Sequence, residues 1–264
     1  MGKKEASMLR VEGINFRVPG RTLLHETTLQ FEPGRFHVIM GANGAGKSTL
    51  LKLLAGELQS VSGKIWLDDA DLSRFTKKEL ALKRAVLSQH YHLSFPISVP
   101  ELVMMGRYPH FAVRPSTIDH SICREAMQLM QVDELADRDY NTLSGGEAQK
   151  AQMGRVLAQI WNATEGASKL LFLDEPVSHL DIRFQHQLLQ TARDLTRKHT
   201  TVIAILHDIN LALSFADRII FMKEGRVVHD LAQPSNVSTT IIRDVFDVEA
   251  SIMQPPDHHP VIIF

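Results

Sequence analysis

Short apolar runs, separated by glycine loops and by segments with helical spacing, make up the hydrophobic pattern of the chain. Residues 36–40 form an apolar run that stops at Gly41, which predicts a buried strand entering a tight turn. Residues 48–55 have the apolar spacing of a helix and stop at Gly56. The order of strand, glycine loop and helix predicts the opening of a parallel α/β unit.

The second half of the chain contains more of these apolar runs. Residues 170–173 and 202–206 are further candidates for buried strands, and a helix-like segment follows each of them. Residues 219–222 and 226–228 flank the polar residues 223–225, so they predict a β-hairpin. The α/β pattern therefore continues almost to residue 230.

A different pattern fills the chain between about residues 92 and 140. Residues 101–106 and 121–132 have helical spacing, and no apolar strand lies between them. We expect a helical subdomain inserted into the α/β core. The tail after about residue 231 is short and ends in an irregular-looking stretch, residues 255–260.

Composition narrows the classes of function. The 264 residues predict one large domain, or one core with a subdomain, and 29 Lys and Arg balance 30 Asp and Glu, so no polybasic nucleic-acid surface is expected. Cys123 is the single cysteine, which excludes an intrachain disulfide and fits a reducing compartment. The N-terminus has no secretory signal, and no window approaches the roughly 18 apolar residues of a spanning helix. We expect any membrane role to come through a partner.

Residues 41–48, with the sequence GANGAGKS, match the P-loop pattern in full. Glycines let the backbone wrap a phosphate, and the following helix offers its positive end to the same anion. Lys47 is expected to contact the β- and γ-phosphates of ATP, and the Ser48 hydroxyl to ligate Mg²⁺. A chance glycine-rich turn is disfavoured by the strand before it and the helix after it. The candidate nucleotide-binding residues here are Gly41, Ala42, Asn43, Gly44, Ala45, Gly46, Lys47, Ser48 and Thr49.

The apolar run 170–173 ends in Asp174 and Glu175. A buried strand would hold Asp174 rigidly near Mg²⁺, and Glu175 would stand where it can act as general base toward an attacking water. Strands often end in acidic turns, so this pair is weak evidence alone. The P-loop upstream makes it strong.

Residues 143–147, LSGGE, decide between the classes of P-loop protein. The sequence resembles the ABC ATPase family, whose signature is LSGGE or LSGGQ. Ser144 is expected to cap a helix that begins near Gly145, with the glycines allowing close approach of a phosphate. An ordinary capped helix start is the alternative, disfavoured by the position between P-loop and Asp174. In the family, the signature Ser144, Gly145, Gly146 and Glu147 would act on the other subunit's nucleotide.

The resemblance extends over essentially the whole chain. It implies that Gln89 is the Q-loop glutamine and a Mg²⁺ ligand, that residues 178–181 with Asp181 form the D-loop, and that His207 is the switch histidine. The implied catalytic residues are Glu175, His207, Gln89 and Lys47. The family places its adenine-stacking aromatic near Val18, which is aliphatic, so Phe16 is the candidate, with a half-buried core role as the alternative. Four positions depart from the usual family residues: Ser88, Ala148, Lys150 and Val177.

The ABC ATPase fold implied by the resemblance is α/β, with a P-loop NTPase (RecA-like) core, an N-terminal antiparallel β subdomain and an inserted α-helical subdomain. We expect a single domain, residues 1–264. Within it, 1–90 and 141–230 would form the nucleotide-binding core, 91–140 the helical subdomain and 231–264 a short C-terminal tail.

One P-loop and one signature in the chain imply a homodimer with two composite sites for ATP and Mg²⁺. DNA-repair members carry long coiled coils between Q-loop and signature, translation factors carry two cassettes, and exporters carry fused membrane helices; these alternatives are disfavoured here. A separate cassette fits an importer at the cytoplasmic face of the bacterial inner membrane. Its implied partners are two copies of a transmembrane permease and, indirectly, a periplasmic binding protein, with no nucleic acid.

The cargo is suggested by two stretches. Residues 105–110, MGRYPH, resemble ATPases of siderophore, cobalamin and heme importers, and residues 155–161 resemble the heme subgroup. Heme is the favoured cargo, with a ferric siderophore or cobalamin as the alternative. We expect no direct heme binding, because the histidines in polar segments are best explained as solvated: His90, His92, His258 and His259. No structural zinc is expected either.

Overall fold

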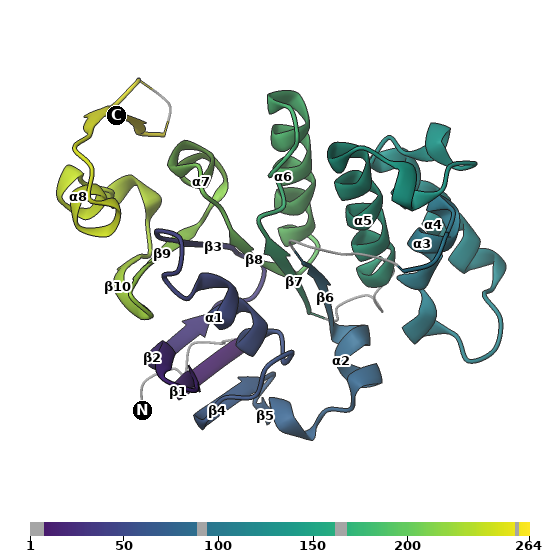
Figure 1. Ribbon diagram of the computed structural model, residues 1–264, viewed down its shortest axis with the longest axis horizontal. Helices are drawn as coiled ribbons and strands as arrows, with labels where there is room; N and C mark the ends of the chain where they lie inside the picture. Colours follow the sequence, from purple (N-terminus) through teal and green to yellow (C-terminus); the bar gives the residue numbers. More distant parts are fainter. Residues whose placement is uncertain (1–7, 89–93, 162–167, 257–258) are drawn as a thin grey trace. The chain divides into compact units, whose positions relative to one another are not determined.

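The computed structural model describes residues 8–88, 94–161, 168–256 and 259–264 (Figure 1). The chain forms two compact units, Met1–Arg74 with Gln190–Phe264, and Phe75–Leu189. They are called unit 1 and unit 2 below, and each is considered by itself. None of the described helices has the length and apolar character that a membrane crossing requires.

Unit 1 begins with an antiparallel sheet in the order β2-β1-β4-β5. Its strands are β1 (Leu9–Val18), β2 (Arg21–Phe31), β4 (Ser62–Leu67) and β5 (Ala70–Asp71). A two-residue turn joins β1 to β2, and Gly20 takes its left-handed position with φ 77°. The N-terminal antiparallel β subdomain that the resemblance implies is therefore present.

The second sheet of unit 1 carries β3 (Phe36–Met40) between β8 (Thr200–Ile205) and β9 (Arg218–Lys223), all parallel. Every residue of β3 and β8 is buried, as expected for parallel strands covered on both faces. The last strand, β10 (Arg226–Leu231), runs antiparallel to β9 across a tight turn. The strands predicted at 36–40 and 202–206 and the predicted hairpin are thus confirmed.

Helices α1, α7 and α8 and a small hairpin also belong to the described part of unit 1. Helix α1 (Lys47–Leu54) follows the P-loop, and α7 (Ile209–Phe215) follows β8. The tail holds α8 (Thr239–Phe246) and the antiparallel pair β11 (Ser251–Met253) and β12 (Val261–Ile263). The described residues of the stretch 255–260 carry no helix or strand, as predicted. The Asn210 side chain pairs with the backbone of Ile262: Asn210 Nδ2 donates to the Ile262 carbonyl at 3.1 Å, and the Ile262 N–H donates to Asn210 Oδ1 at 2.8 Å.

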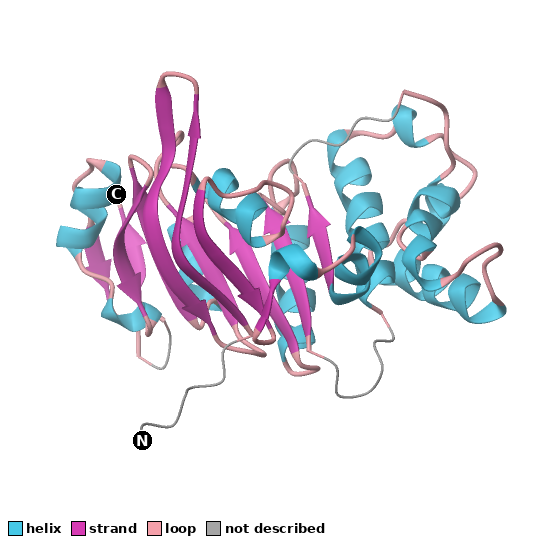
Figure 2. Cartoon of the chain, turned by 90° about the horizontal axis from the view of Figure 1, so that it is seen from below, coloured by secondary structure: helices cyan, strands magenta, loops and turns pink. Residues whose placement is uncertain are grey.

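Unit 2 combines one parallel strand pair with a group of helices. Strands β6 (Arg84–Leu87) and β7 (Lys169–Asp174) run parallel, and α2 (Lys77–Lys83) precedes them. Helices α3 (Val99–Met105), α4 (Thr117–Leu129) and α5 (Gly145–Ile160) pack against one another without an intervening strand (Figure 2). Helix α6 (Ile182–Thr196) begins in unit 2 and ends in unit 1.

The crossing of α3 and α5 requires glycine. A Cβ added to Gly106 would lie 2.1 Å from the Arg155 carbonyl oxygen, so no larger residue fits without moving a backbone. Helix α5 thus packs tightly on the two helices predicted for the inserted subdomain. The functional division at residues 90, 140 and 230 stays a prediction.

Candidate nucleotide site

The P-loop is fixed at both ends by close backbone contacts in unit 1. A Cβ on Gly41 would lie 2.1 Å from the Met222 carbonyl oxygen, and one on Gly46 would lie 2.6 Å from the Leu23 carbonyl oxygen. Gly46 also has φ 94°, which disfavours any L-residue with a side chain. The backbone of the neighbouring strands therefore requires glycine at these two positions.

Helix α1 starts at this loop without a side-chain cap, because its N-cap residue is Gly46. The positive end of a helix that lacks such a cap is suited to an anion. Lys47 is 6% exposed and folds back over the loop, donating to the carbonyl oxygens of Gly41 at 2.9 Å and Ala42 at 3.0 Å. Its ammonium is therefore held at the loop that it is predicted to serve.

A hairpin turn supports the loop from its outer side. The N–H of Gly225 donates to the Ala45 carbonyl at 3.0 Å, and the N–H of His25 donates to the Gly225 carbonyl at 2.8 Å. The turn residues Glu224 and Gly225 have φ values of 49° and 74°, which suit a two-residue β-hairpin turn. These bonds connect β2, the turn and the P-loop into one rigid framework.

His207 stands at the same edge of the sheet as the P-loop. Strands β3 and β8 are parallel with Ile39 beside Ile205, so their carboxyl ends lie together, and His207 follows β8 as the P-loop follows β3. Asp208 then caps α7 by accepting from the N–H groups of Asn210 and Leu211. The carboxyl edge of parallel strands is the usual ligand site of such sheets.

The acidic pair lies in unit 2, at the end of the fully buried strand β7. Asp174 is 4% exposed, and Glu175 has φ 53°, a left-handed conformation that is uncommon for a residue with a side chain. The Glu175 carbonyl accepts from Gln149 Nε2 at 3.1 Å and from Ser178 Oγ at 3.0 Å. Gln149 of α5 thus fixes this turn, a role that the sequence pattern does not reveal.

The signature helix α5 begins at Gly145, and Ser144 caps it as predicted. The cap is a capping box: Ser144 Oγ accepts from the Glu147 N–H at 3.4 Å, while the Ser144 N–H and hydroxyl donate to Glu147 Oε2 at 2.8 Å each. These two donors lower the pKa of the Glu147 carboxyl below its usual value. Arg138 adds an ion pair to Glu147 at 3.2 Å.

The D-loop packs on the signature within unit 2. A Cβ on Gly146 would lie 3.2 Å from the His179 carbonyl oxygen, and one on Gly145 would lie 3.7 Å from His179 Cβ. Asp181 Oδ1 accepts from the Phe184 N–H at 2.9 Å, so this carboxylate also caps the start of α6. Signature and D-loop therefore form one contact surface.

The stretch 105–110 has a structural role in unit 2. Arg107 is 4% exposed, donates from Nε to Asp119 Oδ1 at 2.9 Å, and donates from Nη1 to the Ala158 carbonyl at 2.7 Å. Burial alone would raise the pKa of Asp119, but the Ser116 donors and the Arg107 guanidinium outweigh it and lower that pKa to about 2. His110 Nε2 also lies 2.8 Å from the Gln159 carbonyl oxygen.

Other predicted residues have different placements. Gln89, His90, His92 and His258 lie outside the described residues, so their predicted roles stay predictions. Phe16 is half-buried on β1 opposite Leu24, and Val18 is 38% exposed.

Of the predicted Mg²⁺ ligands, Ser48 belongs to unit 1 and Asp174 to unit 2. Within the described residues no group of three or more metal-ligating side chains is found, and the expectation of no zinc remains to be tested.

The profile of the ABC transporter family matches residues 24–178, from β2 through the P-loop and signature to the D-loop. The chain belongs to the ABC transporter family. Curated members of this family resemble the chain over four fifths or more of their own length. A hemin import ATP-binding protein HmuV of Rhodopseudomonas palustris is 42% identical over 97% of this chain and 94% of its own. Proteins of the same name from Gloeobacter violaceus and Hahella chejuensis are 44% and 41% identical over 84% and 89% of this chain, and 80% and 91% of their own.

Solved ABC structures support the fold. An inward-facing metal-chelate type ABC transporter superposes with a TM-score of 0.78, at 24% identity and over 98% of each chain. A dimeric ATP-binding cassette in a post-hydrolysis state with ADP and Pi gives a TM-score of 0.75, at 24% identity, over 86% of this chain and 99% of that one. The predicted α/β fold class, an ABC ATPase fold, is confirmed.

Proposed function

We propose that this chain is the ATP-hydrolysing subunit of an ABC importer for heme, working as a homodimer with a separate permease. The sequence identity of 42% over 97% of the chain to a hemin import ATP-binding protein carries this proposal. The uncapped start of α1 and the Lys47 ammonium over the P-loop support ATP as the substrate.

The proposed chemistry divides among several residues. Lys47 binds the β- and γ-phosphates, Glu175 positions the attacking water and takes its proton, and His207 and Gln89 hold the γ-phosphate end of the site. The Ser48 hydroxyl, the buried Asp174 carboxylate and the Gln89 side chain are oxygen donors that suit Mg²⁺. When bound, this ion neutralises charge on the phosphates.

The signature acts in trans in this proposal. Ser144, Gly145, Gly146 and Glu147 of one protomer close the site over the P-loop of the other, and Asp181 lies beside them in the D-loop. ATP then joins the two protomers, hydrolysis separates them, and the motion passes to two copies of the permease in the bacterial inner membrane. Heme would reach that permease from a periplasmic heme-binding protein and would not bind this subunit.

Reconstitution with the permease tests the cargo. Purified ATPase and permease in liposomes, with the binding protein added, should hydrolyse ATP faster when the binding protein carries hemin. A response to a ferric siderophore or cobalamin, and none to hemin, would transfer the function to those cargos. Titration of the isolated subunit with hemin should leave its Soret band unshifted. A saturable shift that is lost on His259→Ala would contradict the absence of direct binding.

A mixed-dimer experiment tests the action in trans. Ser144→Arg damages only the signature and Lys47→Ala only the P-loop, so each homodimer has two damaged sites. A mixed dimer places both changes in one composite site and leaves the other intact. Mixing the two inactive proteins should restore hydrolysis if one intact site can turn over alone. Proven heterodimers without activity would contradict independent composite sites.

A further inference from the structure

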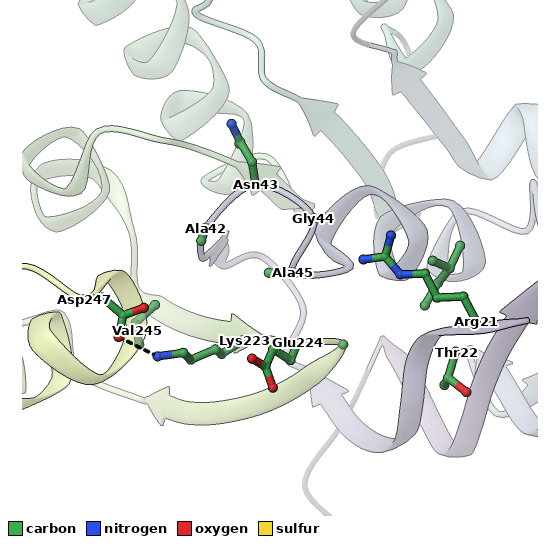
Figure 3. A pocket seen from close by; sticks show the side chains of 12 residues that line it. Arg21, Thr22, Ala42, Asn43, Gly44, Ala45, Lys223, Glu224, Val245 and Asp247 are labelled. Carbon is green, nitrogen blue, oxygen red and sulfur yellow. Dashed lines mark hydrogen bonds and ion pairs between the residues drawn. The ribbon is translucent and has the colours of Figure 1, made fainter.

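A cavity of about 370 Å³ borders the P-loop on the side of β2 in unit 1 (Figure 3). Its wall is formed by the loop residues 42–45, the first residues of β2 from Arg21 to Leu23, the hairpin turn at 223–225, and the end of α8. The volume lies within the range of small-molecule sites. The cavity shares four residues with the phosphate-binding loop, so it lies where the rest of a bound nucleotide can extend.

The cavity has two cations on its wall, and they differ in their partners. Lys223 Nζ is 3.0 Å from Asp247 Oδ1 and also donates to the Asp244 carbonyl oxygen, so the Lys223 ammonium is already paired with a carboxylate. The Arg21 side chain makes no hydrogen bond or ion pair with any other residue that the structure describes. Arg21 is exposed, and its guanidinium extends toward the loop, with Nη2 3.9 Å from the position of a Cβ on Gly44.

Among the residues that the structure describes, none that lines this wall is aromatic. Phe16 is half-buried on β1 and does not line the cavity, and the same is true of Val18. A nucleobase beside the P-loop therefore meets a planar cation, and not the aromatic ring that sequence comparison suggests. A guanidinium stacks on aromatic faces through cation–π attraction and is weakly hydrated, so it can replace a ring as a stacking surface.

We propose that Arg21 is the residue that stacks on the adenine base of the nucleotide, with Thr22 and Leu23 forming the adjacent wall. This inference rests on the proposed function, because it requires the P-loop to hold the phosphates. Stacking uses the face of the base and does not depend on its edge groups. Arg21 therefore contributes affinity for purine nucleotides in general, with little discrimination between ATP and GTP.

The test compares ATP with inorganic tripolyphosphate, which carries the phosphates but no base. Equilibrium binding of both is measured by calorimetry on the full chain with Mg²⁺. Arg21→Ala should weaken ATP binding by roughly 5- to 30-fold and leave tripolyphosphate binding unchanged. Arg21→Trp, which restores a stacking surface without charge, should recover most of the ATP affinity. Arg17→Ala is the matched control, because Arg17 is an exposed arginine of the same hairpin that does not line the cavity.

Each result distinguishes the alternatives. Equal losses for ATP and tripolyphosphate would mean that Arg21 acts on phosphate charge, and this would overturn the stacking role. No loss in Arg21→Ala, together with a selective loss of ATP in Phe16→Ala, would return the role to Phe16. Wild-type protein that binds neither ligand would refute the proposed function itself, whatever Arg21 does.

Discussion

The helix after the P-loop and the signature helix begin in opposite ways. Helix α1 begins after Gly46, with no side-chain cap. Helix α5 begins after Ser144, whose capping box with Glu147 occupies its first turn. A first turn without a cap is prepared for a ligand, whereas a capped first turn is stable alone and must exchange its own contacts when a ligand arrives.

This difference predicts a division of labour. Unit 1 is expected to bind phosphate by itself, because its loop glycines and Lys47 are already arranged around the proposed site. In unit 2, the first turn of the signature helix is already capped by Ser144 and Glu147. The same unit holds the left-handed turn at Glu175, which is expected to supply the general base. The substitutions below test this division, beginning with the largest expected effect.

Glu175→Gln separates chemistry from binding. It keeps the shape of the side chain and removes the base, so hydrolysis should fall by roughly 10²- to 10⁴-fold. ATP affinity should stay the same, and ATP should trap a dimer that size-exclusion chromatography can detect. Glu134→Gln, at an exposed acid of the same unit, is the control. A wild-type hydrolysis rate in Glu175→Gln would place the base elsewhere.

Arg107→Met tests whether unit 2 has its own stability. The change leaves Asp119 buried without its cation, which should cost about 3–5 kcal/mol in the free energy of unfolding. Because the Ser116 donors and the Arg107 guanidinium together lower the pKa of Asp119 to about 2, these contacts stabilise the protein fully above about pH 4 and weaken as the pH falls toward 2. Urea denaturation at pH 7 and pH 3, with exposed Arg114→Met as control, measures both effects. Equal stability of both variants would contradict a structural role for Arg107.

Lys47→Ala tests the binding unit. It removes a charge-assisted contact with the phosphates, so affinity for a fluorescent ATP analogue should fall by roughly 10- to 100-fold. Lys52→Ala, which changes an exposed lysine on the same helix, should leave the affinity unchanged. Unchanged affinity in Lys47→Ala would mean that the P-loop does not bind phosphate as proposed.

Local patterns in the sequence predict the strands and the site motifs closely. Strands β3, β7 and β8 lie where their apolar runs predict, because a strand buried on both faces needs continuous apolar residues. The Ser144 cap is equally local, since both members of the capping box lie within one turn.

Contacts between distant residues could not be predicted in this way. Gln149 binds the Glu175 carbonyl across 26 positions, and Asn210 pairs with Ile262 across 52. Neither residue belongs to a periodic pattern, so only the packing of elements brings them together. The same limit applies to Arg21, which enters the cavity wall because the β1–β2 turn lies beside the P-loop.

Glu147→Gln should give the smallest effect. The lowered pKa of Glu147 means that its capping contacts stabilise the protein above about pH 4.5 and fade as the pH falls further. A slightly lower melting temperature at pH 7, with a smaller difference from wild type at acidic pH, is expected. Glu79→Gln is a matched control, because Glu79 makes the same capping box with Thr76 on α2. The ATPase rate should stay near the wild-type value in both variants, because LSGGQ is as much a family signature as LSGGE; a large loss in Glu147→Gln alone would show that the Glu147 charge itself acts in the signature.

At position 175, selection for stability and selection for activity should favour different residues. The Glu175 φ of 53° costs about 1–2 kcal/mol for a residue with a side chain such as Glu, whereas Gly and Asn accept this conformation more easily. In a library randomised at position 175, selection for heat resistance alone should enrich Gly and Asn. Selection for growth on the imported nutrient should retain Glu, because neither replacement carries a base. The frequency of Glu175 in such populations would therefore report which pressure dominated.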